Sequence, residues 1–202
     1  LHPVIGQALT SDEDRPVAAR ILHRLEEERR AQLAGLRVVI DSEDYVDLLE
    51  AVVAGALRPR LGPRAKEPAA AVLTELVRPR WRRLRRAVLV LGAHPGDDEL
   101  HRVRIMAKRT RYAAELASSV VGDDAADLAT RLAHLQDVLG VRHDTVVAES
   151  WLRRTLPGLD HEARFVAGQL VAVQRTQREA LSSAWPAAWA ACDRKALTRW
   201  LR

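Results

Sequence analysis

Apolar residues recur at α-helical spacing along most of this chain, and this periodicity limits the fold more than any other feature. One run places leucines three or four positions apart and ends on a valine: Leu128, Leu132, Leu135, Leu139 and Val146. A second run has the same spacing: Trp81, Leu84, Val88 and Leu91. Residues with this spacing share one face of a helix, and no segment shows the sustained alternation typical of a strand. The sequence therefore predicts an all-α protein.

Proline, glycine and acidic residues mark the predicted helix ends. Ser11, Asp14 and Pro16 indicate the first start, and Gly122 indicates a stop. About seven helices are predicted, roughly over 11–37, 42–53, 68–91, 98–121, 123–156 and 160–183, with a last one starting at Pro186. Residues 58–68 form a connection, and Pro79 should kink or interrupt the helix that contains it. Long helices joined in this way usually pack antiparallel.

Positive charge is concentrated in the middle of the chain. The 202 residues carry a net charge of +5, and 29 of the 32 cations are arginine. Residues 51–111 alone carry fifteen cations and five anions, a net of +10. Such a segment should attract polyanions or acidic surfaces. The alternative is a solvated helix surface in a chain that uses arginine throughout.

The predicted helix 98–121 carries a narrow polar stripe. At 100° per residue, one side of the helix, about 80° wide, holds four cations and one acid: His101, Arg104, Lys108, Arg111 and Glu115. Apolar residues border the stripe on both sides, with Val103 and Ala107 on one side and Tyr112 and Leu116 on the other. If both borders pack against neighbouring helices, the cations line a cleft. Unpaired buried cations are costly, so acids from other helices, water or an anionic ligand must compensate them.

A second basic group precedes this helix and contains six arginines in nine residues: Arg78, Arg80, Arg82, Arg83, Arg85 and Arg86. With the Trp81 face turned inward, we expect Arg82, Arg85 and Arg86 to project outward. Guanidinium groups bind phosphate oxygens in a bidentate fork, so nucleic acid is one candidate partner. However, only Trp81 is available nearby for base stacking, and no nucleic-acid-binding motif is present.

No catalytic or metal-binding motif is found. The acids Asp97, Asp98 and Glu99 suit a helix start, and His134 and His143 fall on opposite faces of a continuous helix. We therefore expect no enzyme activity, no cofactor and no metal site. A single cysteine, Cys192, indicates a reducing, cytoplasmic compartment. The longest uninterrupted apolar stretch, 87–91, is too short to cross a membrane, and we expect no membrane partner.

Two linked motifs carry a family resemblance. The first is His101-x-x-Arg104-x-x-x-Lys108-Arg109-x-Arg111-Tyr112-x-x-Glu115, and the second is Leu135-Gln136-Asp137-x-Leu139-Gly140-x-x-x-Asp144. Together they resemble the signature helix and the following helix of the CHAD domain, the conserved-histidine α-helical domain. The resemblance implies two repeated helical bundles around a basic channel. It also implies binding of inorganic polyphosphate, an association with polyphosphate granules, and a CYTH-type triphosphatase or polyphosphatase domain as a neighbour.

On this resemblance, polyphosphate-binding residues are expected on the signature helix and before it: His101, Arg104, Lys108, Arg109, Arg111, Arg82, Arg85 and Arg86. Glu115 and Asp144 should orient the cations rather than touch the ligand. The alternative functions are a helical module that binds nucleic acid or an acidic protein, or an accessory domain to a CYTH-type enzyme.

The resemblance covers about residues 78–202 and supplies one signature pair where the family has two. Residues 20–50 resemble 165–195 at a constant offset of 145, for example Leu25 with Leu170 and Arg30 with Arg175. We therefore interpret the chain as a single CHAD-like domain truncated at its N-terminus. Residues 1–57 would be the remainder of the first repeat, and residues 66–202 would be the second repeat.

Overall fold

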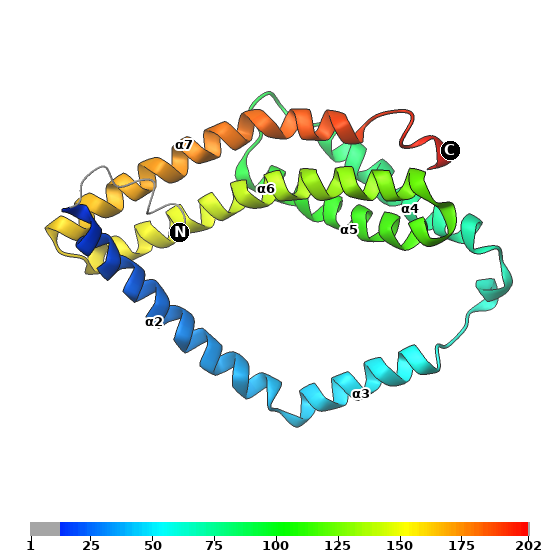
Figure 1. Ribbon diagram of the computed structural model, residues 1–202, viewed down its shortest axis with the longest axis horizontal. Helices are drawn as coiled ribbons and strands as arrows, with labels where there is room; N and C mark the ends of the chain where they lie inside the picture. Colours follow the sequence, from blue (N-terminus) through cyan, green and yellow to red (C-terminus); the bar gives the residue numbers. More distant parts are fainter. Residues whose placement is uncertain (1–12, 202) are drawn as a thin grey trace. The chain divides into compact units, whose positions relative to one another are not determined.

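The computed structural model describes residues 13–201, and within this range the chain forms helices and no strand (Figure 1). The α-helices are α2 (Asp14–Ile40), α3 (Glu43–Leu57), α4 (Ala69–Leu89), α5 (Asp97–Val121), α6 (Asp123–Thr155) and α7 (His161–Cys192). The described residues also form three short 3₁₀ helices: η1 (Pro63–Lys66), η2 (Leu156–Gly158) and η3 (Arg199–Leu201). The predicted all-α class is confirmed. Ser11, the first predicted helix signal, lies outside the described residues.

Several helix ends have the local chemistry that the sequence predicts. The Oγ atom of Ser42 accepts a hydrogen bond from the backbone N–H of Tyr45 at 3.3 Å, which caps α3. The carboxylate of Glu99 accepts from the backbone N–H of Gly96 at 2.8 Å, at the start of α5. Gly122 follows α5 with a φ of 87°, a left-handed value that favours glycine. These ends set the boundaries of the helix that carries the stripe.

The two internal prolines do not end their helices. Helix α7 continues through Pro186 to Cys192, so the predicted end near residue 183 and the separate last helix are wrong. Helix α4 likewise continues through Pro79. A proline inside a helix costs about 3 kcal/mol. In α7 the cost is offset by packing, because the side chains around the proline are buried in the core: Trp185, Ala188, Trp189 and Cys192.

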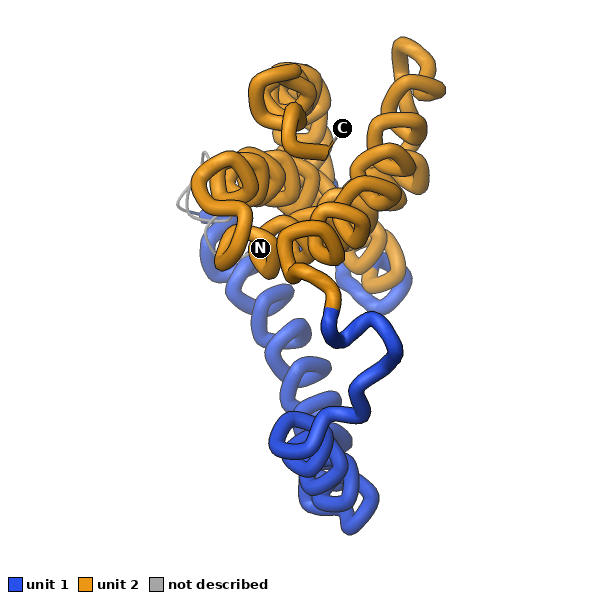
Figure 2. The backbone as a smooth tube through the Cα atoms, turned by 90° about the vertical axis from the view of Figure 1, so that its right-hand side faces the viewer, with its two compact units in different colours: residues 1–66, 156–169 blue, residues 67–155, 170–202 orange. Residues whose placement is uncertain are grey.

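The chain divides into two compact units (Figure 2). Unit 1 contains the residues up to Lys66 together with 156–169, and unit 2 contains 67–155 together with 170–202. One boundary lies inside the predicted 58–68 connection. Helix α7 contributes its first turns to unit 1 and the rest to unit 2. The assignment of 1–57 and 66–202 to two repeats stays a prediction.

Unit 2 contains the main hydrophobic core. In it α5 packs along both α4 and α6 (Figure 1), and the later turns of α7 add to the same core. The indole rings of Trp81 and Trp189 stack with centroids 5.5 Å apart. Burial raises the pKa of the Cys192 thiol to about 12. The predicted apolar faces are buried as expected at Leu84, Leu128, Leu132, Leu135 and Leu139, while Leu91 and Val146 are half-buried.

Unit 1 buries far less of its apolar surface. In α2 only Ala18 and Ile21 are buried, and α3 contains no buried residue. The side chain of Leu57, at the end of α3, is 77% exposed. Within this unit Arg20 lies 3.1 Å from Asp160 and 3.4 Å from Glu162. These pairs are exposed, and exposed pairs contribute at most about 1 kcal/mol each.

Candidate functional site: the cationic face of α5

The predicted stripe lies on one face of α5, beside α6. Its first apolar border is buried as predicted, at Leu100, Val103, Ala107 and Ala114. The second border is open, because Tyr112 is 49% exposed and Leu116 is 56% exposed. The expectation of packing on both sides is therefore wrong. The stripe borders the core on one side and faces solvent on the other, where a long ligand can reach it.

Arg111 is held by contacts within its own helix. Its guanidinium lies 3.2 Å from the carboxylate of Glu115, one turn later, and 4.6 Å from the ring centroid of Tyr112. The ammonium of Lys108 lies 5.7 Å from the same ring. Both distances to the ring fall in the range of cation–π attraction. Glu115 thus forms an ion pair with one cation of the stripe, and the orienting role expected for it stays a prediction.

Arg104 lies flat against α6 where that helix carries a glycine. A Cβ atom built on Gly140 would lie 3.3 Å from Nε of Arg104, closer than nearly all real contacts of this kind. The absence of a side chain at Gly140 therefore makes room for the guanidinium. Among the described residues, no carboxylate lies within ion-pair distance of Arg104 or Lys108. The Nε atom of Arg104 is also buried without a hydrogen-bond partner.

His101 meets a second histidine across the α5–α6 contact. The rings of His101 and His143 are 4.2 Å apart between centroids. Burial lowers the pKa of His143, and the positive charge of His101 and Arg104 lowers it further. Asp144 and Asp97 act in the opposite direction. Asp144 is exposed and forms no ion pair with the stripe among the described residues, so its predicted orienting role is limited to this effect on His143.

The histidine pair has no third metal-ligating side chain beside it in the described part of the chain. Within residues 13–201, no three side chains of the His, Cys, Asp and Glu types gather closely enough to hold an ion. The sequence placed His134 and His143 on opposite faces of one helix, and the continuous α6 keeps them apart. The partner of His143 comes instead from α5, forty-two positions earlier in the chain, which helical spacing alone cannot reveal.

The other predicted binding residues lie apart from the stripe. Arg82 and Arg85 line a cavity of about 350 Å³ beside the C-terminal segment, together with Arg78, Asp193 and Lys195. In this cavity Nε of Arg85 donates to the carboxylate of Asp193 at 3.0 Å. Arg86 is exposed on α4, as expected. Arg109 lies on the side of α5 that faces α4, where it lines a different cavity with Arg80 and Arg83.

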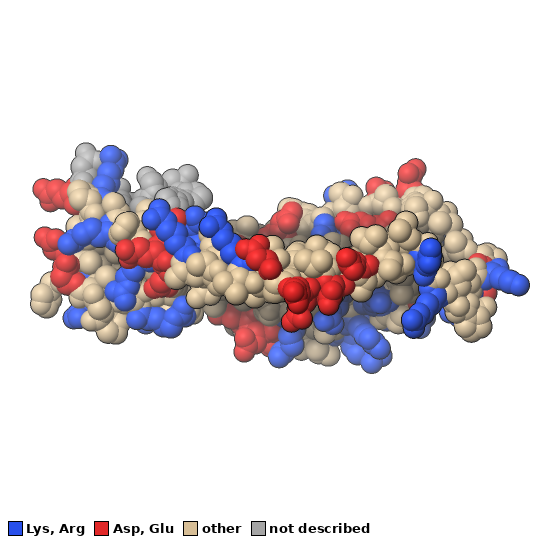
Figure 3. All heavy atoms as spheres, turned by 90° about the horizontal axis from the view of Figure 1, so that it is seen from below, with Lys and Arg blue, Asp and Glu red and all other residues tan. Residues whose placement is uncertain are grey.

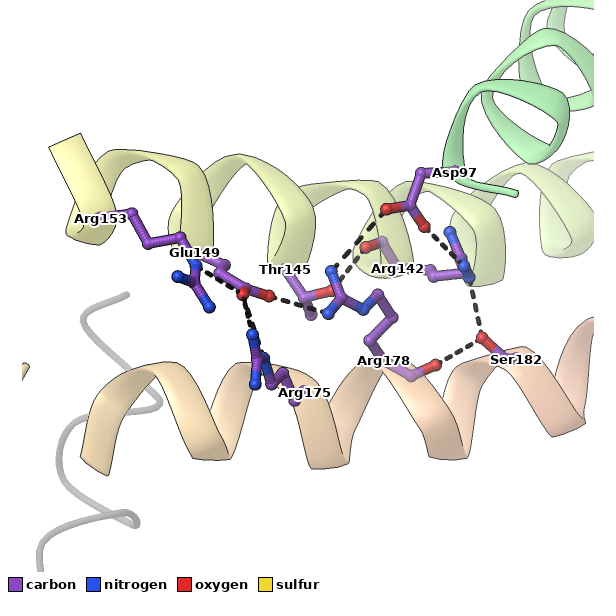
Figure 4. Close-up of polar contacts among 8 residues, drawn as sticks. All are labelled: Asp97, Arg142, Thr145, Glu149, Arg153, Arg175, Arg178 and Ser182. Atoms are coloured by element: carbon purple, nitrogen blue, oxygen red, sulfur yellow. Dashed lines mark hydrogen bonds and ion pairs between the residues drawn. The ribbon is translucent and has the colours of Figure 1, made fainter. Parts of the chain in front are cut away.

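An ionic network that the sequence reading missed joins α6, α7 and the start of α5 (Figure 4). Glu149 accepts hydrogen bonds from Arg153, Arg175 and Arg178 at 2.8–3.0 Å. A guanidinium nitrogen of Arg142 lies 2.7 Å from Asp97, and its Nε donates to Ser182 at 2.9 Å. The i, i+4 spacing of Glu149 and Arg153 was a visible signal. The pairs that involve Arg142, Arg175 and Arg178 needed the helix packing.

This network holds more positive than negative charge. Four guanidinium groups surround two carboxylates, and Arg142 is only 6% exposed. Burial alone would raise the pKa of Glu149, but the three arginine hydrogen bonds outweigh it and lower the pKa to about 2. Asp97 was interpreted as a helix-start acid, and it also serves here as the counter-ion of Arg142. The network therefore fixes α6 against α7 while keeping excess positive charge.

Charged side chains of both signs are spread over the face drawn in Figure 3, with uncharged surface between them. The basic residues predicted to bind a ligand fall into separate local groups, because Arg82 and Arg85 line one cavity, Arg109 lines another, and the stripe lies apart from both. The three lysines are also separated: Lys66 lies in η1, Lys108 in the stripe and Lys195 at the cavity beside Arg82. In the described part of the chain, no helix has the length and apolarity of a membrane span.

Over residues 13–201 the chain is helical without strands, and α5 carries a row of cationic side chains on one face. The sequence model of the CHAD domain family matches residues 4–153. The chain belongs to the CHAD domain family. This range contains both motifs that carry the resemblance, begins upstream of the expected residue 78 and ends before 202. A comparison with curated proteins finds no match.

Proposed function

We propose that this chain binds inorganic polyphosphate through the stripe of α5. The observation that carries the proposal is the pair Arg104 and Lys108, which have no carboxylate partner in the described residues, with Arg104 half-buried against α6 and Lys108 exposed. Polyphosphate has about one negative charge per phosphate and no base or sugar that a protein could recognise. Membership of the CHAD family, to which the resemblance attributes polyphosphate binding, supports the same ligand.

The spacing of the stripe suits a linear polyanion. Side chains three or four positions apart on a helix lie about 5–6 Å apart. His101, Arg104, Lys108 and Arg111 thus form a row along α5, with the open border beside Tyr112 giving access. Arg104 and Arg111 would bind oxygens as forks, and Lys108 would act as a point charge. Because one border is open, the chain of phosphates need not thread through an enclosed passage.

The other roles expected for this chain stand as parts of the proposal. Arg82, Arg85 and Arg86 would extend the basic surface for a longer polyphosphate chain, with Arg85 already paired with Asp193. Polyphosphate granules and a CYTH-type triphosphatase are the proposed cellular partners, and the chain itself would bind rather than catalyse. The single cysteine supports a cytoplasmic location.

The decisive experiment measures long-chain polyphosphate binding by isothermal titration calorimetry at low and high salt. Contacts of this kind release counterions, so affinity should fall steeply as salt rises. The triple change Arg104→Ala, Lys108→Ala and Arg111→Ala should abolish binding. A matched triple change at Arg82, Arg85 and Arg86 should weaken binding to long chains only. Affinity that stays flat with salt, or binding unchanged in the stripe variant, would contradict the proposal.

Nucleic acid is the second candidate, favoured only by the arginine excess. Competition separates the two ligands. Polyphosphate should displace a labelled polyphosphate probe far better than duplex DNA at equal phosphate concentration, because the stripe is one helix wide. Equal displacement by both would indicate a general polyanion or nucleic-acid surface, and displacement by an acidic protein alone would indicate a protein partner.

A further inference from the structure

A second basic cavity lies on the opposite side of α5 from the stripe. It occupies about 620 Å³ between α4 and α5 and is lined by Pro79, Arg80, Arg83, Met106, Arg109 and Thr110. Sites that bind small molecules typically occupy 300–1,000 Å³. Arg109 leaves α5 at about 80° or more from every cation of the stripe, at 100° per residue. The cavity is therefore separate from the polyphosphate row, and we call it the α4–α5 groove.

The charge of the groove is uncompensated among its own residues. Three guanidinium groups from two helices line it, and no carboxylate does. One nitrogen of Arg80 donates to the backbone carbonyl of Leu76 at 2.6 Å, which fixes that side chain along α4. Arg83 and Arg109 are exposed and have no ion pair within the described residues. Guanidinium groups that line one cavity from two helices are suited to bidentate binding of phosphate oxygens.

The rest of the groove is apolar. Pro79 has no N–H group to donate, and Met106 contributes a half-buried thioether side chain. The hydroxyl of Thr110 donates to the carbonyl of Met106 at 2.8 Å, so its proton is already used inside α5. Methionine sulfur makes favourable contacts with aromatic rings, and guanidinium groups stack on ring faces. The groove thus offers an aromatic-binding surface next to a phosphate-binding one.

We propose that the α4–α5 groove binds a nucleoside di- or triphosphate. The phosphates lie against Arg80, Arg83 and Arg109, and the base packs on Met106 and Pro79. An inorganic phosphate chain, which has no base, would contact the arginines of the groove but not Met106 and Pro79. The proposal is independent of polyphosphate binding, because it shares none of the stripe cations.

The test is a titration of the full chain with ATP, without magnesium, by isothermal titration calorimetry. Arg83→Gln and Arg109→Gln should each weaken ATP binding about tenfold, the usual effect of losing one charge-assisted hydrogen-bonding partner. The matched control is Arg131→Gln, which removes an exposed arginine of α6 outside both sites and should leave affinity unchanged. Arg104→Gln with Arg111→Gln should also leave ATP affinity unchanged while reducing polyphosphate binding.

Inorganic triphosphate isolates the contribution of the base when it is titrated into the Arg104→Gln, Arg111→Gln variant, in which the stripe no longer competes for it. It should bind the groove at least about tenfold more weakly than ATP, and Met106→Ala should weaken ATP but not triphosphate. Circular dichroism checks that each variant keeps its helix content. No ATP binding at millimolar concentration, or ATP binding lost in the stripe variant and kept in the groove variants, overturns the site. Equal affinity for ATP and triphosphate overturns the nucleotide assignment.

Discussion

At the scale of single residues, Gly140 is the member of the 135–144 motif whose residue type the structure explains most directly. Glycine inside a helix costs about 1 kcal/mol relative to alanine, yet here it leaves space for Arg104. The glycine therefore exchanges some helix stability for the position of one guanidinium.

Gly140→Ala should consequently raise the free energy of unfolding by up to about 1 kcal/mol, because alanine is the better helix former. The new Cβ displaces the Arg104 guanidinium, so polyphosphate affinity should fall roughly two- to fivefold. Chemical denaturation and calorimetric titration measure the two effects. The control is Gly168→Ala in α7, where a Cβ meets nothing within 4 Å, and where only stability should change. Affinity retained in Gly140→Ala would show that Arg104 does not need this position.

The histidine pair predicts proton uptake on binding. Burial and the neighbouring charges of His101 and Arg104 lower the pKa of His143 below its ordinary 6.5, so the free protein keeps this ring neutral near neutral pH. A bound polyanion favours the charged ring and raises that pKa again. Polyphosphate affinity should therefore increase as pH falls from about 7.5 to 5.5, with protons taken up from the buffer.

Calorimetry in two buffers of different ionisation enthalpy counts these protons. His143→Gln should remove most of the uptake, whereas His134→Gln, a change at an exposed histidine of the same helix, should not. The stability of the free protein should change in the opposite direction to the affinity. Because the pKa of His143 is lowered on folding, the free energy of unfolding decreases as pH falls below the ordinary histidine pKa. Identical pH dependence in the wild type and in His143→Gln would contradict this role.

At the scale of helices, the ionic network between α6 and α7 makes stability depend on acid pH. The pKa of Glu149 is about 2 in the folded chain against an ordinary 4.5. A carboxyl group with a lowered pKa contributes stability that is fully present above about pH 4.5 and is lost as pH falls towards 2. The unfolding free energy of the wild type should decrease over this interval.

Glu149→Gln should cost about 2 kcal/mol at neutral pH, since it removes the buried carboxylate that accepts charge-assisted hydrogen bonds from Arg153, Arg175 and Arg178. It should also flatten the loss of stability between about pH 4.5 and 2. Urea denaturation at a series of pH values measures both effects. Glu179→Gln, at an exposed acid of α7, is the control and should keep the wild-type pH profile. A parallel profile in Glu149→Gln would assign the acid sensitivity to other groups.

Helix positions were largely predictable because periodicity and end signals act locally. Ser42, Gly122 and the leucines of α6 determined their helices through contacts a few residues apart. The helix break predicted before Pro186 was wrong because Trp185 and Trp189 are buried in the core, and their packing against other helices stabilises a continuous α7. The stripe itself was read correctly from spacing. Its open border, the ring pair of His101 and His143, and the partners of Arg142 depend on which helices meet.

At the scale of the whole chain, the two units differ in how much apolar surface they bury. Unit 2 has a continuous core over α4 to α7, whereas α3 in unit 1 has no buried residue. Local opening costs little free energy where few apolar contacts are lost. The backbone hydrogen bonds of α3 should therefore open far more easily than those of α6.

Hydrogen exchange measured by mass spectrometry on the full chain tests this difference. Amides of α3 should exchange at least about 100-fold faster than those of the buried segment 128–139 in α6. The buried amides of α5 should exchange about as slowly as those of α6, which gives a second comparison. Equal protection of α3 and α6 would contradict this difference and would show that another protein surface covers α3 in solution.

The distribution of lysines has a practical consequence for mapping the ligand. Arginine does not react with acylating reagents, so labelling of side-chain amines reports on only three positions in this strongly basic chain. Lys108 marks the stripe, Lys195 marks the cavity beside Arg82, and Lys66 marks the η1 turn. A polyanion bound to α5 should shield Lys108 while Lys66 continues to react. Protection at Lys195 would then record how far a longer phosphate chain extends, and the labelling pattern would act as a footprint of its length.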